Sequence, residues 1–288
     1  MKVPALDFMM PGFPRCGTTT ITHLLSEHPG IFITTPKEPG FFKPRNYQKR
    51  QSWRDYAQLF DGADPQAVQG EGTVTYTTSW PPELADPREV YRHYPELKLI
   101  FLMRDPVERI VSQWVNKTQQ NYPKDIPVFE KCTTHYSIFL DTSRYWNHIT
   151  RWLEYFDDEQ VLAICLEQFK ENPRQLMQMI EDFLDVERYE YDFQTRLNAS
   201  NVARRDSNFE RYIKRNEFTY KAAQLAKQIL PLDRVHQLLK NEKTVQWDED
   251  TLRWVRKELD SDSRAALEYA DLNPSYWPKM FPGESERS

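Results

Sequence analysis

Residues 6–20 read LDFMMPGFPRCGTTT, and the expected fold follows from this segment. Its apolar start, residues 6–10, ends at a Pro-Gly pair, which is typical of a buried strand that meets a turn. Beyond the loop, apolar residues recur at helical spacing from Ile21 to Leu25. The segment therefore predicts a strand, a loop and a helix, in that order.

Two glycines in this loop have the spacing of a phosphate-binding loop. Gly12 and Gly17 are placed as in G-x-x-x-x-G-K-[ST], but Thr18 stands at the lysine position and Thr19 follows it. Backbone N–H groups at the start of a helix still favour an anion. Without the lysine, the γ-phosphate of a nucleoside triphosphate loses its main cationic partner, whereas Arg15 offers a guanidinium fork to another oxyanion. The loop predicts a site for an anionic nucleotide other than ATP, with an ordinary strand-turn-helix corner as the alternative.

The same residues carry a family resemblance. The sequence GFPRCGTTT, residues 12–20, resembles the 5′-phosphosulfate loop of the sulfotransferases, which use 3′-phosphoadenosine 5′-phosphosulfate (PAPS). The resemblance implies PAPS as co-substrate, with its 5′ end held by residues 11–20. The loop residues for which it implies contacts to PAPS are Arg15, Cys16, Gly17, Thr18, Thr19 and Thr20.

A second segment contains a candidate general base. Residues 34–42 read TTPKEPGFF, where prolines restrict the backbone and two phenylalanines supply an apolar wall near Glu38. A general base needs such placement, although an exposed Lys-Glu pair on a surface turn would read the same way. The segment resembles the Lys-Glu-x-x-Phe-Phe of glycosaminoglycan-type sulfotransferases, which implies Glu38 as the catalytic base. Arg15 in the loop is the second catalytic candidate, because its guanidinium can stabilise charge on the transferring sulfuryl group and on the leaving phosphate.

The chain departs from that branch at one position. Residues 68–76 predict a strand that enters a loop. The glycosaminoglycan enzymes carry Glu-Lys-Thr-Pro at a similar strand end, with a lysine that contacts the sulfuryl region. Gly72 stands in place of that lysine, which leaves the acceptor class and the charge distribution open.

A third segment matches the other end of the nucleotide. Residues 99–103, LIFLM, predict a central parallel strand that ends at Arg104, where open α/β sheets bind ligands. The Asp-Pro pair that follows, with Glu108, predicts a helix that begins with a capping box. Arg104 and Ser112, within residues 104–114, resemble the family's 3′-phosphate motif, arginine-x₇-serine. The alternative pairs Arg104 with Glu108 and leaves Ser112 to fill the gap between helix and sheet.

The resemblance covers roughly residues 6 to 185, and it extends weakly beyond them. Many sulfotransferases have a basic loop that closes over the nucleotide, which makes Arg204 and Arg205 candidates for the 3′-phosphate. A solvated surface pair is an equal alternative.

Composition narrows the class of protein. The 288 residues carry a net charge of −5 with both signs interspersed, which argues against a nucleic-acid-binding surface. No apolar run approaches the roughly 20 residues of a membrane span. No secretory signal precedes the first strand. Cys16, Cys132 and Cys165 show neither metal-ligand nor disulfide spacing, which suits a reducing compartment. A cytoplasmic protein is expected, with a trimmed Golgi-lumen catalytic domain as the alternative.

Alternating strands and helices predict one doubly wound α/β domain over residues 1–288. Its central sheet is expected to be mainly parallel, with a helical C-terminal part and a polar tail at 282–288. The expected activity is sulfuryl transfer from PAPS to an acceptor hydroxyl, a carbohydrate first, without a metal. A small-molecule kinase on the same loop and a non-catalytic nucleotide-binding protein are the alternatives. Acceptor identity, oligomeric state and the role of residues 117–143 stay undecided.

Overall fold

A computed structural model describes residues 3–43, 53–78, 84–120, 137–193 and 247–284. The chain divides into two compact units, residues 1–191 with 247–288 and residues 192–246. Nearly all of the second unit falls outside the described residues. A single domain over the whole chain therefore remains a prediction.

In the described part of the chain, one sheet of parallel strands runs in the order β2-β3-β1-β4-β5. The strands are β1 (Phe8–Gly12), β2 (Ile31–Ile33), β3 (Val68–Glu71), β4 (Lys98–Met103) and β5 (Val161–Cys165). All residues of β1, and all but the first of β4, are buried, because helices cover both faces of a sheet of this kind. The predicted α/β fold with a mainly parallel sheet is confirmed.

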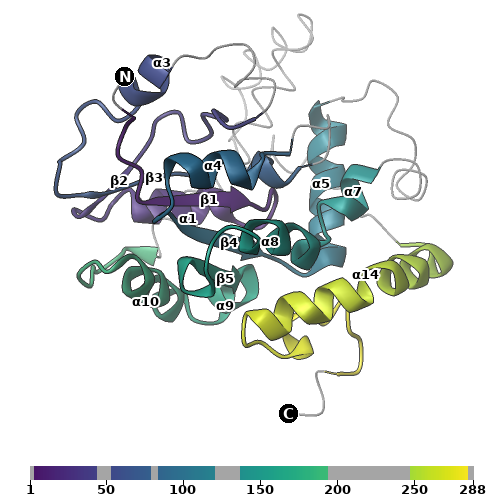
Figure 1. Ribbon diagram of the computed structural model, residues 1–288. Coiled ribbons are helices and arrows are strands. Elements are labelled where there is room, and N and C mark those ends of the chain that lie inside the picture. Colours follow the sequence, from purple (N-terminus) through teal and green to yellow (C-terminus); the bar gives the residue numbers. More distant parts are fainter. Residues whose placement is uncertain (1–2, 44–52, 79–83, 121–136, 194–246, 285–288) are drawn as a thin grey trace, which may run out of the picture. The chain divides into compact units, whose positions relative to one another are not determined.

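The connections between strands are helical. The α-helices are α1 (Thr18–Leu25), α3 (Trp53–Gln58), α4 (Pro87–His93), α5 (Pro106–Gln120), α7 (Ser137–Asp141), α8 (Tyr145–Leu153), α9 (Leu166–Glu171), α10 (Pro173–Leu184) and α14 (Glu249–Tyr269). Three short 3₁₀ helices accompany them in the described chain: η1 (Val74–Thr77), η2 (Asp158–Gln160) and η3 (Pro274–Tyr276). Figure 1 shows α4 and α8 in front of the sheet.

The strand order predicts a ligand site at the carboxyl ends of the central strands β1 and β4. From β1 the chain passes through α1 to β2 on one side, whereas from β4 it passes to β5 on the other. Open α/β sheets bind ligands at such a switch point, outside the carboxyl ends of the strands. The loop after β1 and the residue after β4, Arg104, both lie at this edge.

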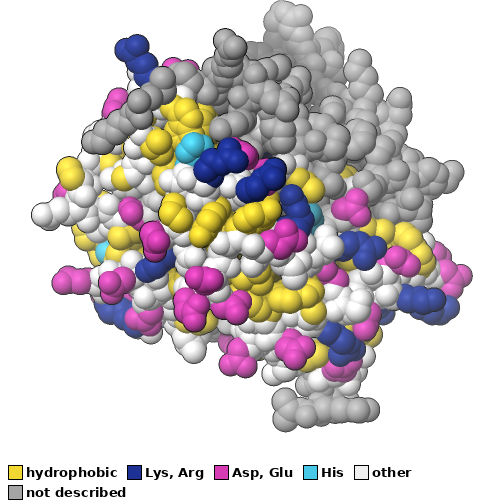
Figure 2. All heavy atoms as spheres, in the orientation of Figure 1, with side chains coloured by type: hydrophobic (Ala, Val, Ile, Leu, Met, Phe, Trp, Pro, Cys, Tyr) yellow, Lys and Arg dark blue, Asp and Glu magenta, His cyan; other side chains and the backbone are white. Residues whose placement is uncertain are grey.

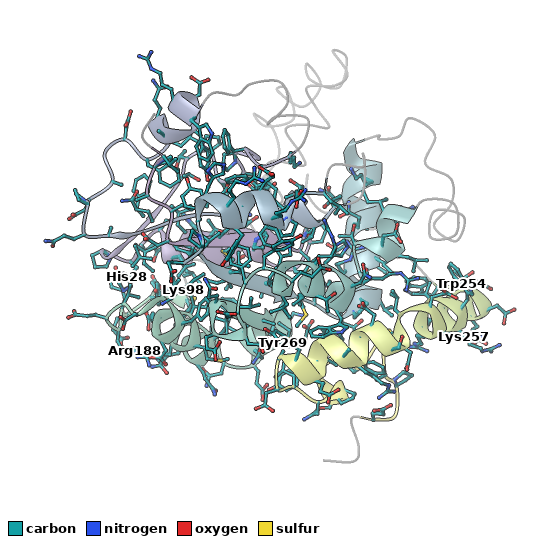
Figure 3. The ribbon with its side chains drawn as sticks, in the orientation of Figure 1. His28, Lys98, Arg188, Trp254, Lys257 and Tyr269 are labelled. Atoms are coloured by element: carbon teal, nitrogen blue, oxygen red, sulfur yellow. The ribbon has the colours of Figure 1, made fainter. Side chains whose placement is uncertain are left out.

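The C-terminal segment completes the core of the same unit. Helix α14 packs against α8 and α5, and its Tyr269, labelled in Figure 3, donates a 3.2 Å hydrogen bond to Asp158. Beyond α14, Trp277 is fully buried with its ring 5.6 Å from that of Tyr145. Residues far apart in sequence therefore share one apolar core.

The visible surface carries both signs of charge. On the face in Figure 2, Lys and Arg side chains lie among Asp and Glu side chains, and a short row of basic side chains runs across the upper middle of the view. Among the described helices, none has the length and apolarity to cross a membrane.

Candidate active site

The loop between β1 and α1 has a backbone that few side chains tolerate. Gly17 has φ 90°, and a Cβ there would lie 2.6 Å from Cδ1 of Leu166. Arg15 also has a positive φ, 73°, which is uncommon for a residue with a side chain and recurs at functional sites. The loop therefore turns sharply enough for α1 to begin at Thr18, with its first-turn N–H groups at the crevice.

The loop is supported from beneath by buried side chains. Cys16 is fully buried with Sγ 3.7 Å from the Tyr145 hydroxyl, and burial raises the pKa of its thiol to about 12. Phe13 is fully buried, and its ring centre lies 4.6 Å from that of Tyr145. Cys16 is thus a filler under the loop, and only its backbone can serve the predicted anion site.

The two predicted nucleotide-binding motifs meet at the edge of the sheet. Arg15 Nε donates a 3.2 Å hydrogen bond to Ser112 Oγ, across 97 positions of sequence. Arg104 Nη1 donates to the carbonyl oxygen of Arg15 at 3.4 Å. Two guanidinium groups and a hydroxyl therefore lie within one cluster, a donor set that suits phosphate and sulfate oxygens.

Arg104 is also held by one acidic neighbour, Glu108. Its Nη2 lies 2.7 Å from Glu108 Oε2, and Lys170 Nζ lies 3.6 Å from the same oxygen. Burial raises the pKa of Glu108, but hydrogen bonds and charge from Arg104 outweigh burial, and the pKa is lowered. The pairing of Arg104 with Glu108 that the sequence left as an alternative is present, and it coexists with the contact to the phosphosulfate loop.

At the start of α5 the structure has the predicted N-cap but lacks the second hydrogen bond of the predicted capping box. Asp105 Oδ1 accepts from the N–H groups of Val107, at 2.9 Å, and Glu108, at 3.3 Å, as an N-cap does. The reciprocal bond of a capping box is missing, because Glu108 turns to Arg104 and Glu167 Oε1 lies 3.5 Å from the Asp105 amide instead. The capping-box prediction was wrong in that respect.

The segment with the candidate base lies beside the phosphosulfate loop. Lys37 Nζ donates to Thr18 Oγ1 at 3.3 Å and to Thr19 Oγ1 at 3.4 Å. The Glu38 carboxylate, 40% exposed, lies 3.7 Å from the same ammonium. Burial lowers the pKa of Lys37, and the charge of Glu38 opposes this shift. Both the base and the Lys-Glu pair expected from the sequence are therefore compatible with this geometry.

A buried carboxylate anchors that segment. Glu71, 1% exposed at the end of β3, accepts 2.8 Å hydrogen bonds from the hydroxyls of Thr73 and Tyr76. These hydroxyls accept in turn from the backbone N–H groups of Gly40 (3.1 Å) and Phe42 (3.2 Å). Burial raises the pKa of Glu71 to about 7, although hydrogen bonds from Thr73 and Tyr76 favour the charged form. Glu71 fixes the loop that carries Lys37 and Glu38.

Sequence reasoning missed three supporting side chains. Lys37 enters the sequence argument only as a neighbour of Glu38, and neither Glu71 nor Tyr145 receives a role there. Tyr145 is fully buried, but its hydroxyl donates a 2.7 Å hydrogen bond to the carbonyl oxygen of Arg104 and so links both motifs. The Lys-Glu dipeptide and the Glu at the end of the predicted strand were the available signals.

Some predicted features cannot be placed. Arg204, Arg205, Cys132 and most of residues 117–143 lie outside the described residues. Within the described ranges, no group of three or more His, Cys, Asp or Glu is arranged to hold a metal ion.

A cavity of about 490 Å³ lies at the opposite end of the sheet, where the strands begin. It is lined by residues such as Asp7 and Lys98, and none of the predicted site residues lines it.

Comparison with known proteins agrees with this arrangement. The family described as "Sulfotransferase domain" matches residues 6–229. Carbohydrate sulfotransferase 15 of Mus musculus is 26% identical over 244 residues, with 62% of this chain and 43% of the relative covered. Heparan sulfate glucosamine 3-O-sulfotransferase 3B1 of Homo sapiens is 30% identical over 186 residues, with 62% of this chain and 45% of the relative covered.

A solved structure gives the same fold. The sulfotransferase from Alicyclobacillus acidocaldarius superimposes with a TM-score of 0.65 at 20% identity, covering 96% of this chain and 99% of that one. The match spans less than half the length of these two curated relatives. The family match covers most of the chain, including both motifs that meet at the sheet edge. The chain belongs to the sulfotransferase domain family.

Proposed function

We propose that the protein transfers the sulfuryl group of PAPS to an acceptor hydroxyl, with a carbohydrate as the first choice of acceptor. The observation that carries the proposal is the 3.2 Å contact between Arg15 and Ser112, because it joins the 5′ and the 3′ motif in one cluster. The relatives named for carbohydrate and heparan sulfate sulfation support the acceptor class. A cytoplasmic location remains a prediction.

The reaction assigns a role to each polar group in the site. Glu38 takes the proton of the acceptor hydroxyl while the acceptor oxygen forms a bond to sulfur. The bond between sulfur and the 5′-phosphate oxygen breaks, and its electron pair stays on that oxygen, which yields adenosine 3′,5′-bisphosphate. Arg15 and the first-turn N–H groups of α1 stabilise charge on the sulfuryl group and the leaving phosphate. Arg104 and Ser112 bind the 3′-phosphate.

The kinase alternative needs a direct control. The loop has no lysine at Thr18, but Lys37 brings an ammonium group to the hydroxyls of Thr18 and Thr19. The site therefore has a lysine near the helix start, so charge alone does not separate a kinase from a sulfotransferase. Membership of the sulfotransferase domain family favours sulfuryl transfer. Magnesium-dependent consumption of ATP would support the kinase instead.

The test is transfer of labelled sulfate from PAPS to a panel of sugar, lipid and small-molecule acceptors. We expect the wild-type protein to transfer label to a carbohydrate hydroxyl. The Glu38→Gln variant is expected to bind adenosine 3′,5′-bisphosphate normally and to lose activity by about 10²- to 10⁴-fold, because the base is gone.

Glu96→Gln is the matched control, since Glu96 is exposed at the amino-terminal edge just before β4 and is expected to leave the rate unchanged. Transfer by Glu38→Gln at the wild-type rate would remove Glu38 as base. Nucleotide binding without transfer to any acceptor would favour the non-catalytic alternative.

A further inference from the structure

The described site contains a cation that comes from outside the phosphosulfate loop. The Lys37 ammonium lies 3.3 and 3.4 Å from the hydroxyls of Thr18 and Thr19, the first two residues of α1. Thr18 occupies the position at which phosphate-binding loops of the G-x-x-x-x-G-K-[ST] type carry their lysine. The segment after β2 therefore brings an ammonium group to the helix start at which the loop sequence has no lysine.

The Lys37 side chain passes beside Gly72 on its way to the hydroxyls of Thr18 and Thr19. A Cβ at Gly72 would lie 3.5 Å from Cε and 3.7 Å from Cγ of Lys37, so the lysine chain runs alongside this glycine. The Gly72 N–H also donates to the Lys37 carbonyl oxygen at 3.3 Å. A Cβ at position 72 would therefore be in ordinary van der Waals contact with Lys37, and its tightest contact would be with Oγ1 of Thr22, at 3.3 Å.

The surroundings of the ammonium suit an additional anion. The Lys37 side chain is only 24% exposed, and its contacts to Thr18 and Thr19 are to neutral oxygens. Its carboxylate neighbour, Glu38, is 3.7 Å away and 40% exposed, and such partly exposed pairs contribute little. A partly desolvated ammonium gains most from a charged oxygen at short range.

We propose that Lys37 binds the 5′-phosphosulfate end of PAPS and stabilises the phosphate oxygen that leaves when sulfur is transferred. This assignment rests on the proposed function. When the bond between sulfur and that oxygen breaks, the electron pair remains on the oxygen, and the ammonium donates a hydrogen bond to it without losing its proton. The acceptor's proton goes to Glu38, so the adjacent residues Lys37 and Glu38 act on opposite sides of the transferred group.

The test compares two nucleotides by isothermal titration calorimetry. Adenosine 3′,5′-bisphosphate carries the 5′ group, whereas adenosine 3′-monophosphate lacks it. Lys37→Met keeps the length of the side chain and removes the charge. We expect it to weaken binding of the bisphosphate about 10-fold or more, and to change binding of the monophosphate less than about twofold. Lys257→Met is the control, because Lys257 is exposed on α14 (Figure 3). The Lys257→Met variant should bind both nucleotides as the wild type does.

A charge-relocation variant makes the test sharper. Lys37→Ala empties the space beside Gly72, and Gly72→Lys in that background offers an ammonium from the neighbouring strand end. We expect the double variant to recover a large part of the lost affinity for the bisphosphate, whereas Gly72→Lys alone gives little gain because Lys37 already supplies an ammonium group there. Such non-additivity is the signature of two positions that serve one interaction.

Each result has a distinct meaning. Equal losses for both nucleotides in Lys37→Met would assign Lys37 to holding the loop and overturn the proposal, as would unchanged affinity for the bisphosphate. Failure of the wild-type protein to bind adenosine 3′,5′-bisphosphate at all would overturn the proposed function together with this inference. Thermal unfolding of each variant shows that the fold is kept.

Discussion

At the scale of single residues, the site depends on a glycine whose place no other residue can take. Gly17 combines a left-handed backbone with close approach of Leu166, whose Cδ1 would lie 2.6 Å from a Cβ. The first feature favours glycine whatever surrounds it, and the second depends on one neighbour. The two contributions can therefore be separated by mutation.

Gly17→Ala is expected to lower the free energy of unfolding by about 1–2 kcal/mol from the backbone alone, and by more from the clash. Adding Leu166→Ala should remove the clash but not the backbone term, so the double variant should be more stable than the two separate losses predict. Urea unfolding of the four proteins measures this. Wild-type stability in Gly17→Ala would contradict the loop geometry.

Glu71 gives a second prediction at this scale, because its environment makes folding depend on pH. The usual pKa of its carboxyl is 4.5, and burial raises it to about 7 in the folded protein. Between these values the unfolded chain has released the proton that the folded protein still holds. The contribution of Glu71 to stability therefore falls as pH rises from about 4.5 to about 7, and stays low above that.

We expect Glu71→Gln to remove this dependence, because an amide does not titrate in that range. The difference in free energy of unfolding between variant and wild type should shift in favour of the variant as pH rises from 5 to 8, on the order of a few kcal/mol. Taking the difference cancels other groups, among them His148, whose pKa burial lowers to about 4. A difference that is the same at both pH values would show that Glu71 does not titrate there.

At the scale of elements, the sequence was sufficient where structure is local. The buried runs of β1 and β4, the Asp105 cap of α5 and the start of α10 at Pro173 each follow from adjacent residues, and the structure has all of them. Periodicity and helix-start chemistry act within one element, which is why they can be read directly from the chain.

The contacts between elements could not be predicted in the same way. Lys37 follows β2 and Thr18 follows β1, and the two residues meet because both strands flank β3 in a parallel sheet and end on the same side. Tyr145 joins Cys16 to Arg104 because α8 packs near the carboxyl end of β4. Each contact depends on strand order, which no single segment specifies. The motifs predict candidate site residues, and the strand order determines which of these residues meet.

At the scale of the whole molecule, the C-terminal segment supports a site to which it supplies no predicted ligand. Asp105 Oδ2 accepts from the backbone N–H groups of Lys279, at 2.8 Å, and Met280, at 3.1 Å. Trp277 lies beside Tyr145 in the core. Residues 277–280 therefore brace both sides of Arg104, far beyond the second motif in sequence.

Trp277→Ala is expected to lower the free energy of unfolding by about 3–5 kcal/mol, because it removes a fully buried indole. Binding of adenosine 3′,5′-bisphosphate should weaken as well, since Tyr145 and Asp105 lose support. Trp254→Ala is the matched control: Trp254 is 37% exposed on α14 and should change neither quantity much. Equal effects of the two substitutions would contradict the packing of the C-terminal segment.

The hydrogen bonds that Arg104 makes within the protein have a consequence for ligand recognition. Of the five N–H groups of a guanidinium, three already have partners, two through Glu108 and one through the Arg15 carbonyl oxygen. The side chain thus loses its rotational freedom when the protein folds rather than when a nucleotide arrives, and its other two donors have no hydrogen-bond partner among the described residues. Recognition of the anion begins from a rigid template, so its entropic penalty is small and its selectivity comes from geometry.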